Sequence, residues 1–256
     1  MNTYDFPVKL IPIKAENILI PNKVAVIRED TSQPIGVVSS QYGLLKHQEV
    51  IECFRKALKK TKHEEKIMMT KNGAHLIATY KLPEAQMEVK KGDLVSMQFI
   101  VKNSYDGTKS FSLMLGAFRL VCSNGMIIGK EIFTYSQRHF SGNAMFGDAN
   151  GIIETKIPEL ISHFKEALPI MKAMTKTILT ESTEMLFEKE TLELPKYLIA
   201  GAKDIYEKTK EKTLWEYYNS LTFAISHNLK KDSPQSQLDY TKRVWKVAMN
   251  HLPVKT

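Results

Sequence analysis

The stretch that decides the fold is Leu94-Val-Ser-Met-Gln-Phe-Ile-Val-Lys102, followed by Asn103-Ser-Tyr-Asp-Gly107 and Lys109-Ser-Phe-Ser-Leu-Met-Leu115. Its two flanking runs are rich in the β-branched and aromatic residues that strands prefer. Asp106-Gly107 between them is a strong turn signal, because both residue types tolerate a positive φ. The sequence therefore predicts a β-hairpin here.

Two further hairpins are predicted on the N-terminal side. Val24–Arg28 and Ile35–Ser39 are short β-branched runs separated by turn residues. Lys66–Thr70 and Ala74–Leu82 flank Lys71-Asn72-Gly73, where Asn-Gly is again a hairpin signal. Strands joined mainly by hairpins form mostly antiparallel sheets.

Helices are predicted in two places. The stretch His47–Lys60 has apolar residues at spacings of three and four, which marks one buried helical face. From about residue 155 the pattern is helical throughout, and Pro158 suits the first turn of its first helix. The sequence Thr213-Leu-Trp-Glu216 has the spacing of a capping box. The expected helix starts are Thr155, Pro195, Thr213 and Ser233.

These patterns predict an α+β fold: a mostly antiparallel hairpin sheet with one basic helix, followed by a helical C-terminal region. We expect residues 1–150 to be a basic, strand-rich region that binds nucleic acid. Residues 151–256 are expected to serve packing and assembly. The Gly- and Asn-rich loop at 141–151 is the expected boundary.

The charge distribution favours a polyanionic partner. The net charge is +8, and residues 1–150 hold 20 Lys and Arg against 14 Asp and Glu. Residues 151–256 hold 16 against 14, so the positive field belongs mainly to the first region. Such a field attracts nucleic acid, although many basic proteins bind none.

Several function classes find no support in the sequence. The chain contains no P-loop, no G-x-G-x-x-G, no G-x-S-x-G and no H-E-x-x-H motif. Its two cysteines and seven scattered histidines suggest neither a disulfide framework nor a metal site. We expect a cytoplasmic protein without a cofactor, a catalytic motif or a membrane-spanning helix.

The helix at 47–62 is the first candidate for nucleic-acid binding, because five cations fall within eight residues. An ordinary solvated helix surface is the alternative. The cations are Arg55, Lys56, Lys59, Lys60 and Lys62.

Two further candidates combine cations with aromatic rings. The hairpin tip would display Tyr105 and Lys109 between Lys102 and Arg119, or be only a tight turn. The stretch Lys130–Phe140 interleaves the two residue types, or is a strand with buried aromatic rings. Its candidate contacts are Lys130, Tyr135 and Arg138.

Five blocks of the sequence resemble, in order, a domain of unknown function that is common in phage and plasmid proteins. Gly36-Val-Val-Ser-Ser-Gln-Tyr42 is similar to its GVVS-x-x-Y opening, and Asn103–Gly107 to its NS-x-DG turn. The third block, Phe118-Arg-Leu-Val-Cys-Ser-Asn-Gly125, is similar to its R-x-VCSN element. The last two blocks are the pair Arg138-His139 and the stretch Leu214-Trp-Glu-Tyr-Tyr-Asn-Ser-Leu-Thr222. Tyr105 stands where that family usually has His, which weakens any role for a catalytic histidine at this turn.

The order of hairpins, helix and long helices is also similar to phage single-strand annealing proteins of the Sak and Rad-fifty-two type. This resemblance rests on element order and charge. It implies a ring or filament that binds single strands along a basic groove and pairs complementary strands without a nucleotide motif.

The leading hypothesis is therefore a phage-type protein that binds single-stranded DNA and anneals strands during recombination or replication. It would act as a homo-oligomer in the host cytoplasm, together with host recombination proteins. The alternative is a protein-binding module that inhibits or modulates a host factor. A third hypothesis, an enzyme using carboxylates such as Asp93 and Asp106, has no supporting spacing.

Overall fold

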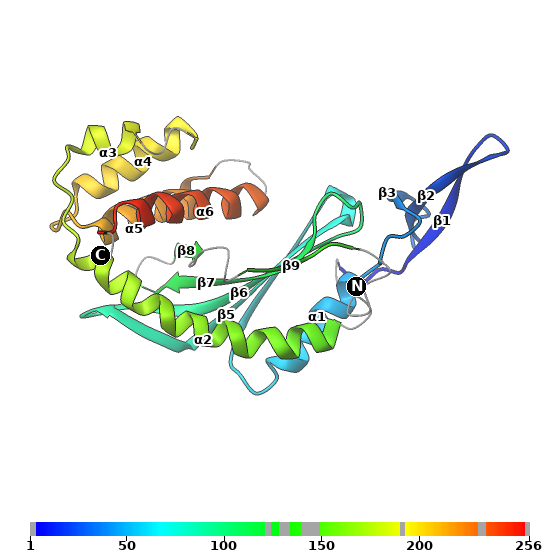
Figure 1. Cartoon of the computed structure of the whole chain (residues 1–256), viewed down its shortest axis with the longest axis horizontal. Coiled ribbons are helices and arrows are strands. Elements are labelled where there is room, and N and C mark those ends of the chain that lie inside the picture. Colours follow the sequence, from blue (N-terminus) through cyan, green and yellow to red (C-terminus); the bar gives the residue numbers. More distant parts are fainter. Residues whose placement is uncertain are drawn as a thin grey trace. The chain divides into compact units, whose positions relative to one another are not determined.

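The computed structural model describes residues 4–120, 124–127, 134–139, 149–189, 193–229 and 234–253. Its strands and helices have the α+β composition predicted from the sequence (Figure 1). The strands are β1 (Val8–Ala15), β2 (Ile18–Arg28), β3 (Pro34–Ser39), β4 (Glu64–Thr70), β5 (His75–Lys90), β6 (Asp93–Ser104), β7 (Phe111–Arg119), β8 (Asn124–Ile127) and β9 (Thr134–Gln137). The helices are α1 (His47–Ala57), the short turn η1 (Lys71–Gly73), α2 (Ala149–Lys176), α3 (Thr183–Lys189), α4 (Lys196–Glu207), α5 (Leu214–Asn228) and α6 (Pro234–Asn250).

The first sheet has three strands in the order β1-β2-β3, and both pairings are antiparallel. The predicted pairing of the runs at 24–28 and 35–39 is confirmed, with Val24 opposite Val38. Strand β1 was not predicted. It contains Pro12, and its turn into β2 uses Glu16 at φ 53° instead of a glycine, so the usual hairpin signals are missing.

The second sheet has six strands, in the order β4-β5-β6-β7-β8 with β9 also paired to β7. The predicted hairpins around Lys71–Gly73 and Asn103–Gly107 both form, as β4–β5 and β6–β7. Asn72 has φ 55° and Gly107 has φ 71°, the left-handed backbone that Asn-Gly and Asp-Gly accept.

The helices follow the predicted pattern, with corrections at three of them. The first ends at Ala57 instead of Lys60, and α3 begins at none of the predicted starts. Thr213 begins α5 as predicted, since its Oγ1 accepts a hydrogen bond from the Glu216 backbone N–H at 3.3 Å. The expected start near Thr155 is wrong, because α2 begins at Ala149. Thr155 lies inside the helix and donates its hydroxyl to the Gly151 carbonyl at 2.8 Å, and Pro158 lies beyond the first turn.

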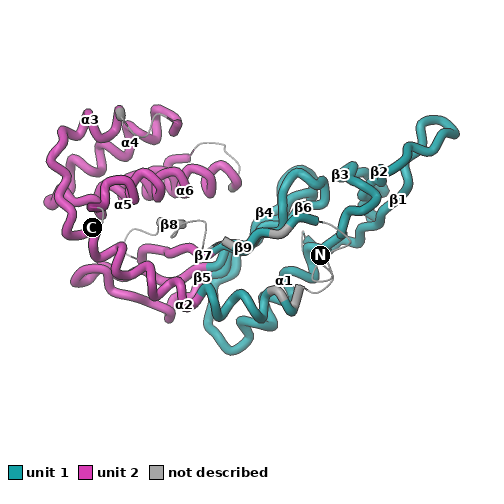
Figure 2. Tube along the Cα trace, in the orientation of Figure 1, with its two compact units in different colours: residues 1–80, 99–114, 134–160 teal, residues 81–98, 115–133, 161–256 magenta. Residues whose placement is uncertain are grey.

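The chain divides into two compact units, each built from several segments (Figure 2). Unit 1 comprises residues 1–80, 99–114 and 134–160, and unit 2 comprises 81–98, 115–133 and 161–256. The predicted division at residue 150 remains a prediction. Within the described residues, none of the helices combines the length and apolar character that a bilayer crossing requires.

The core of unit 1 lies under the three-stranded sheet and against α1. Phe6, Val26, Tyr42 and Tyr105 belong to one buried cluster. The Phe54 ring of α1 stacks on Tyr80 at a centroid distance of 4.8 Å. The apolar face predicted for α1 is therefore the buried face, and its cations face outward.

Unit 2 contains a buried ion pair that joins a strand end to a helix. The Arg119 guanidinium donates from Nε to Asp93 Oδ1 at 2.7 Å and from Nη2 to Asp93 Oδ2 at 2.6 Å. Trp215 Nε1 donates to Asp93 Oδ2 at 2.8 Å. Arg119 and Asp93 are both buried, so the carboxylate fixes β7 to α5. Arg119 thus lacks the surface position that the predicted phosphate contact assumes.

Removing the Asp93 carboxylate should destabilise the fold strongly. We expect Asp93→Ala to lower the free energy of unfolding by about 3 kcal/mol, because it leaves the buried Arg119 charge without its counter-ion. Asp30→Ala, which breaks an exposed pair with Arg28, is the control and should have a much smaller effect. Chemical denaturation of the two variants measures the difference, and equal losses would contradict the structural role of Asp93.

Candidate functional site

The turn between β6 and β7 is held by Asp106. Its Oδ1 accepts hydrogen bonds from the Thr108 backbone N–H at 3.0 Å and from the Thr108 hydroxyl at 2.7 Å. This side-chain-to-backbone bond is the usual way in which Asp stabilises a tight turn. The alternative considered from the sequence, in which Asp106 serves the turn, is therefore the arrangement found.

Tyr105 lies inside unit 1 and not at the surface. Its side chain is 1% exposed, so the prediction of an exposed stacking ring is wrong. The ring stacks on the His47 imidazole at a centroid distance of 3.8 Å. Its hydroxyl accepts a hydrogen bond from the His47 backbone N–H at 2.7 Å. Tyr105 therefore fixes the first residue of α1 against the turn.

The His47 ring is satisfied on both nitrogens as a neutral imidazole. Asn103 Nδ2 lies 2.9 Å from His47 Nδ1 and also donates to the Leu45 carbonyl at 2.7 Å. Since an amide nitrogen only donates, Nδ1 must accept, and Nε2 then donates to the Gly73 carbonyl 3.1 Å away. Burial lowers the pKa of His47 to about 3, in agreement with a neutral ring.

Strand β3 passes directly over this turn. A Cβ at Gly36 would fall 2.6 Å from the Asp106 Cα and 2.7 Å from the Tyr105 carbonyl oxygen, so only glycine fits. Farther along the chain, the Tyr42 hydroxyl donates to the Ser104 carbonyl at 2.7 Å. The Gly36–Tyr42 block and the Asn103–Gly107 block are therefore packed against each other.

His139 reaches the same place from the end of β9. Its ring stacks on Tyr42 at a centroid distance of 4.8 Å, and its Nδ1 lies 3.1 Å from the Gly43 carbonyl. Burial lowers the pKa of His139 to about 4. Three blocks that are far apart in the sequence thus meet in one set of side chains, which we call the tip cluster. The tip cluster consists of Gly36, Tyr42, His47, Asn103, Tyr105, Asp106 and His139.

His75 and Lys71 border the tip cluster on the β4–β5 side. His75 Nε2 lies 2.8 Å from Asp106 Oδ2 and 3.0 Å from Thr108 Oγ1, and Lys71 Nζ lies 3.4 Å from Asp106 Oδ2. Burial alone would raise the pKa of Asp106, but the bonds from Thr108 and His75 hold it below its ordinary value. The partners of this carboxylate are thus Thr108 within the turn and His75 and Lys71 from the β4–β5 side, all of them groups of the protein itself. Among the described residues, no cluster of His, Cys, Asp or Glu has the arrangement of a metal site.

Five cations at the C-terminal end of α1 form a separate surface, which we call the α1 basic surface. Arg55 and Lys56 lie in the last turn of the helix, and Lys59, Lys60 and Lys62 follow it. All five are exposed. Arg55 binds Glu65 through Nε at 3.0 Å and Nη2 at 2.5 Å, and this hydrogen-bonded carboxylate raises its pKa. Lys56 Nζ lies 3.6 Å from Glu154, a pair so exposed that it contributes little.

Lys59 and Lys60 are the least engaged of these cations. In the part of the chain that the structure describes, no carboxylate lies within ion-pair distance of either ammonium group. The α1 basic surface is therefore only partly neutralised by the protein itself.

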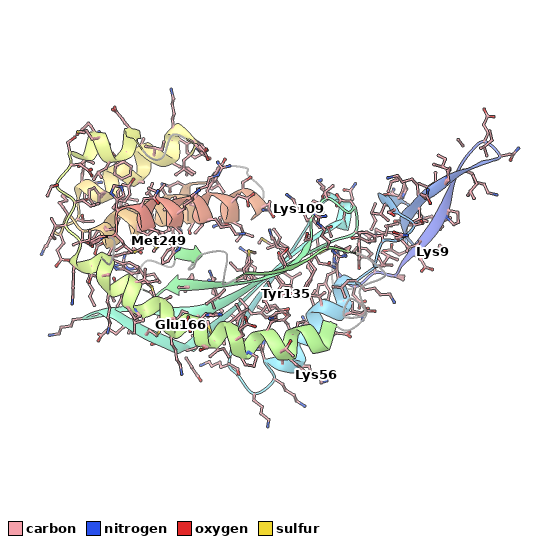
Figure 3. All side chains as sticks on the ribbon, viewed as in Figure 1. Lys9, Lys56, Lys109, Tyr135, Glu166 and Met249 are labelled. Atoms are coloured by element: carbon pink, nitrogen blue, oxygen red, sulfur yellow. The ribbon has the colours of Figure 1, made fainter. Side chains whose placement is uncertain are left out.

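Other candidates come from other segments of unit 1. Lys109 is exposed at the β6–β7 turn, and Figure 3 places it apart from Lys56. Arg138 is exposed beside His139, and Lys102 is half-buried on β6. Tyr135 is half-buried, with Lys156 Nζ 5.5 Å from its ring centroid. Lys130 lies outside the described residues.

Sequence reasoning missed the histidines of the tip cluster. His47 and His139 are separated by most of the strands, so no spacing rule connects them. The available signal was their place relative to the motif blocks: His47 follows the Gly36–Tyr42 block, and His139 belongs to the Arg138-His139 pair.

A family model described as a domain of unknown function (DUF932) matches residues 34–247. The chain belongs to the DUF932 family. The DUF932 match begins at β3 and ends within α6, so it includes both the tip cluster and the Asp93–Arg119–Trp215 contact. Strands β1 and β2 precede it. No solved structure matches the chain.

Gly36 gives a direct test of the packing between the first two DUF932 blocks. We expect Gly36→Ala to lower the free energy of unfolding by about 2 kcal/mol, because the new methyl group meets backbone atoms that cannot move aside. Gly201→Ala is the matched control: its methyl meets only the tip of the Asn228 side chain, and alanine favours helix. Thermal unfolding of both variants distinguishes them, and an unchanged Tm for Gly36→Ala would show that β3 does not press on the turn.

The neutral histidines predict a pH dependence of stability. The pKa of an unfolded His is about 6.5, whereas His47 and His139 have pKa values of about 3 and about 4 in the folded protein. As pH falls below about 6.5, the unfolded chain therefore takes up protons that the folded chain does not. Each residue then removes up to about 1.4 kcal/mol of stability per pH unit, until its folded pKa is reached.

Thermal unfolding between pH 7 and pH 4.5 measures this loss. His139→Gln should show a smaller decrease in Tm over this range than the unchanged protein. His227→Gln, which alters an exposed histidine, should show the full decrease. Equal pH profiles for the His139→Gln variant and the unchanged chain would mean that His139 is not held neutral.

Proposed function

We propose that this DUF932 protein binds single-stranded DNA and promotes the annealing of complementary strands as a homo-oligomer, without covalent chemistry. We place it in phage or plasmid recombination or replication, in the host cytoplasm. The observation that carries the proposal is the α1 basic surface, where five exposed cations lie within eight residues and two have no carboxylate partner among the described residues.

The arrangement of the α1 basic surface suits a phosphate backbone. The cations lie on the last turns of α1 and in the turn that follows it, while Phe54 on the opposite face is anchored on Tyr80. Several cations gathered at one helix end replace the counter-ions of successive phosphates, and the released ions provide the main driving force for binding.

The buried position of Tyr105 changes how the bases would be handled. Since its ring is stacked on His47, it offers no platform for a base. Binding would then depend mainly on phosphates, with little preference for sequence. A strand held by its phosphates keeps its base edges available to a second strand, which is what annealing requires. The similarity in element order to Sak and Rad-fifty-two type proteins also supports the proposal.

The salt dependence of binding tests the proposal. We expect the unchanged protein to bind a fluorescent single-stranded oligonucleotide with an affinity that falls steeply with salt. Replacing Lys56, Lys59 and Lys60 together by Ala should reduce the slope of log K against log salt by about 2, since each phosphate contact on a single strand contributes about 0.7. Fluorescence anisotropy at several salt concentrations measures both slopes.

The matched control replaces three exposed lysines of α2, namely Lys165, Lys172 and Lys176. It removes the same net charge and should leave the slope nearly unchanged. The annealing rate of two complementary oligonucleotides should fall with the α1 variant and not with the control. No binding at low salt, or equal effects of both triple variants on the slope, would contradict the proposal. A stable complex with a host protein, together with no affinity for DNA, would favour the protein-binding module instead.

A further inference from the structure

The outer part of the β1–β2 ribbon exposes an unusual amount of apolar surface. We call residues 9–23 the arm. Strand β3 pairs with β2 only from Lys23 to Ile27, so Ile18 and Leu19, which lie opposite Ala15 and Lys14, have β1 as their single partner strand. Ile18 is 73% exposed, and the other large exposed side chains of the arm are Leu10, Ile11, Leu19 and Ile20. A two-stranded ribbon without a covering layer is marginally stable in water, so the arm is built to be covered by a partner.

The arm is poorly suited to pairing with a second arm. Strand β1 is an edge strand, but Pro12 removes a backbone donor, and Lys9 and Lys14 place charge along the edge. These are the devices that block strand addition. The arm carries three lysines against one glutamate, so two arms placed together would also repel each other. Its partner should therefore be apolar and acidic, and should contact side chains.

Unit 2 contains a segment with that chemistry. Residues 178–188, which we call the acidic segment, expose Ile178 at 62% and Met185 at 52%. Their charged residues are all acidic: Glu181, Glu184 and Glu188. On α3, Glu188 lies four positions after Glu184 and three after Met185, so its side chain neighbours each of them on the helix surface.

Few other surfaces of the described chain match the arm. Outside the three-stranded sheet, the exposed large hydrophobic residues among the described ones are Ile161, Ile178, Met185 and Tyr197. Two of these four belong to the acidic segment. Glu184 is paired with Lys203 at 2.7 Å, whereas Glu181 and Glu188 have no cation within ion-pair distance among the described residues. The acidic segment thus retains negative charge with which to attract the arm.

We propose that the arm of one copy packs on the acidic segment of a second copy. The two surfaces differ, so the contact is head-to-tail, and each added copy presents a new arm and a new acidic segment. Such a contact builds a ring or a filament. It goes beyond DNA binding, because its chemistry needs no nucleic acid, and it uses arm residues that precede the DUF932 match.

Sedimentation velocity of the full chain without DNA, over a range of concentrations, tests the contact. The unchanged protein should form species larger than dimers. The arm variant Lys14→Glu with Ile18→Ser and the segment variant Met185→Ser with Glu188→Lys should each weaken association about tenfold or more, since each removes apolar contact and reverses one charge. The matched control, Ile161→Ser with Glu166→Lys, changes exposed residues of α2 and should assemble normally (Figure 3 labels Glu166).

Mixing the two variants distinguishes a head-to-tail contact from a symmetric one. The arm variant keeps an intact acidic segment, and the segment variant keeps an intact arm, so an equimolar mixture should form a heterodimer and nothing larger. Circular dichroism of each variant confirms that it is folded.

Four results would overturn the inference: an unchanged protein that is monomeric at every concentration, an arm variant that assembles normally, a segment variant that assembles normally, or a mixture that stays monomeric when both variants have lost assembly. A segment variant that assembles while the arm variant does not would indicate contact between two arms. A monomeric protein that still binds single-stranded DNA would overturn the assembly contact alone and leave the DNA-binding proposal standing.

Discussion

The stacking of the neutral His47 imidazole on the Tyr105 ring is the interaction on which unit 1 depends most. It places the first turn of α1 against the β6–β7 turn, and the hydrogen bonds of His47 to Asn103 and Gly73 extend the contact to two hairpins. A protonated ring could not accept from Asn103, and burial makes the charged form unfavourable. The geometry therefore requires an uncharged histidine, whose two ring nitrogens both have partners in this buried site.

The DUF932 blocks are explained by this constraint and by a second one in unit 2. Gly36 allows β3 to cross the turn, and Asp106 closes that turn. In unit 2, Asp93 holds Arg119 and Trp215, which come from two further blocks of the family. These motif residues are buried or half-buried and bonded within the protein. The blocks therefore build the framework, while the α1 basic surface and the arm lie on the outside and are the parts available to partners.

Much of the fold could be predicted because its hairpins and helices carry local signals. Asn72-Gly73, Asp106-Gly107 and the Thr213 cap each act through residues that are neighbours in the sequence. Strand β1 was not predicted, because its turn into β2 contains no glycine. The start of α2 was predicted too far along the chain. At the site, helical spacing correctly placed the exposed Arg55 and Lys56, whereas Lys59 and Lys60 lie beyond the end of α1 at Ala57. The burial of Tyr105 and Arg119 could not be predicted, since it depends on His47 and Asp93, partners that are distant in the sequence and carry no spacing signal.

In this proposal the motif blocks form the framework, and the cations of the α1 basic surface contact the DNA. Chemical acetylation of lysines, read by mass spectrometry with and without a single-stranded oligonucleotide, distinguishes the two roles. We expect the oligonucleotide to protect Lys56, Lys59 and Lys60 while Lys165 and Lys172 of α2 react as before. Equal protection of both sets, or protection confined to α2 and the helices after it, would contradict the proposal.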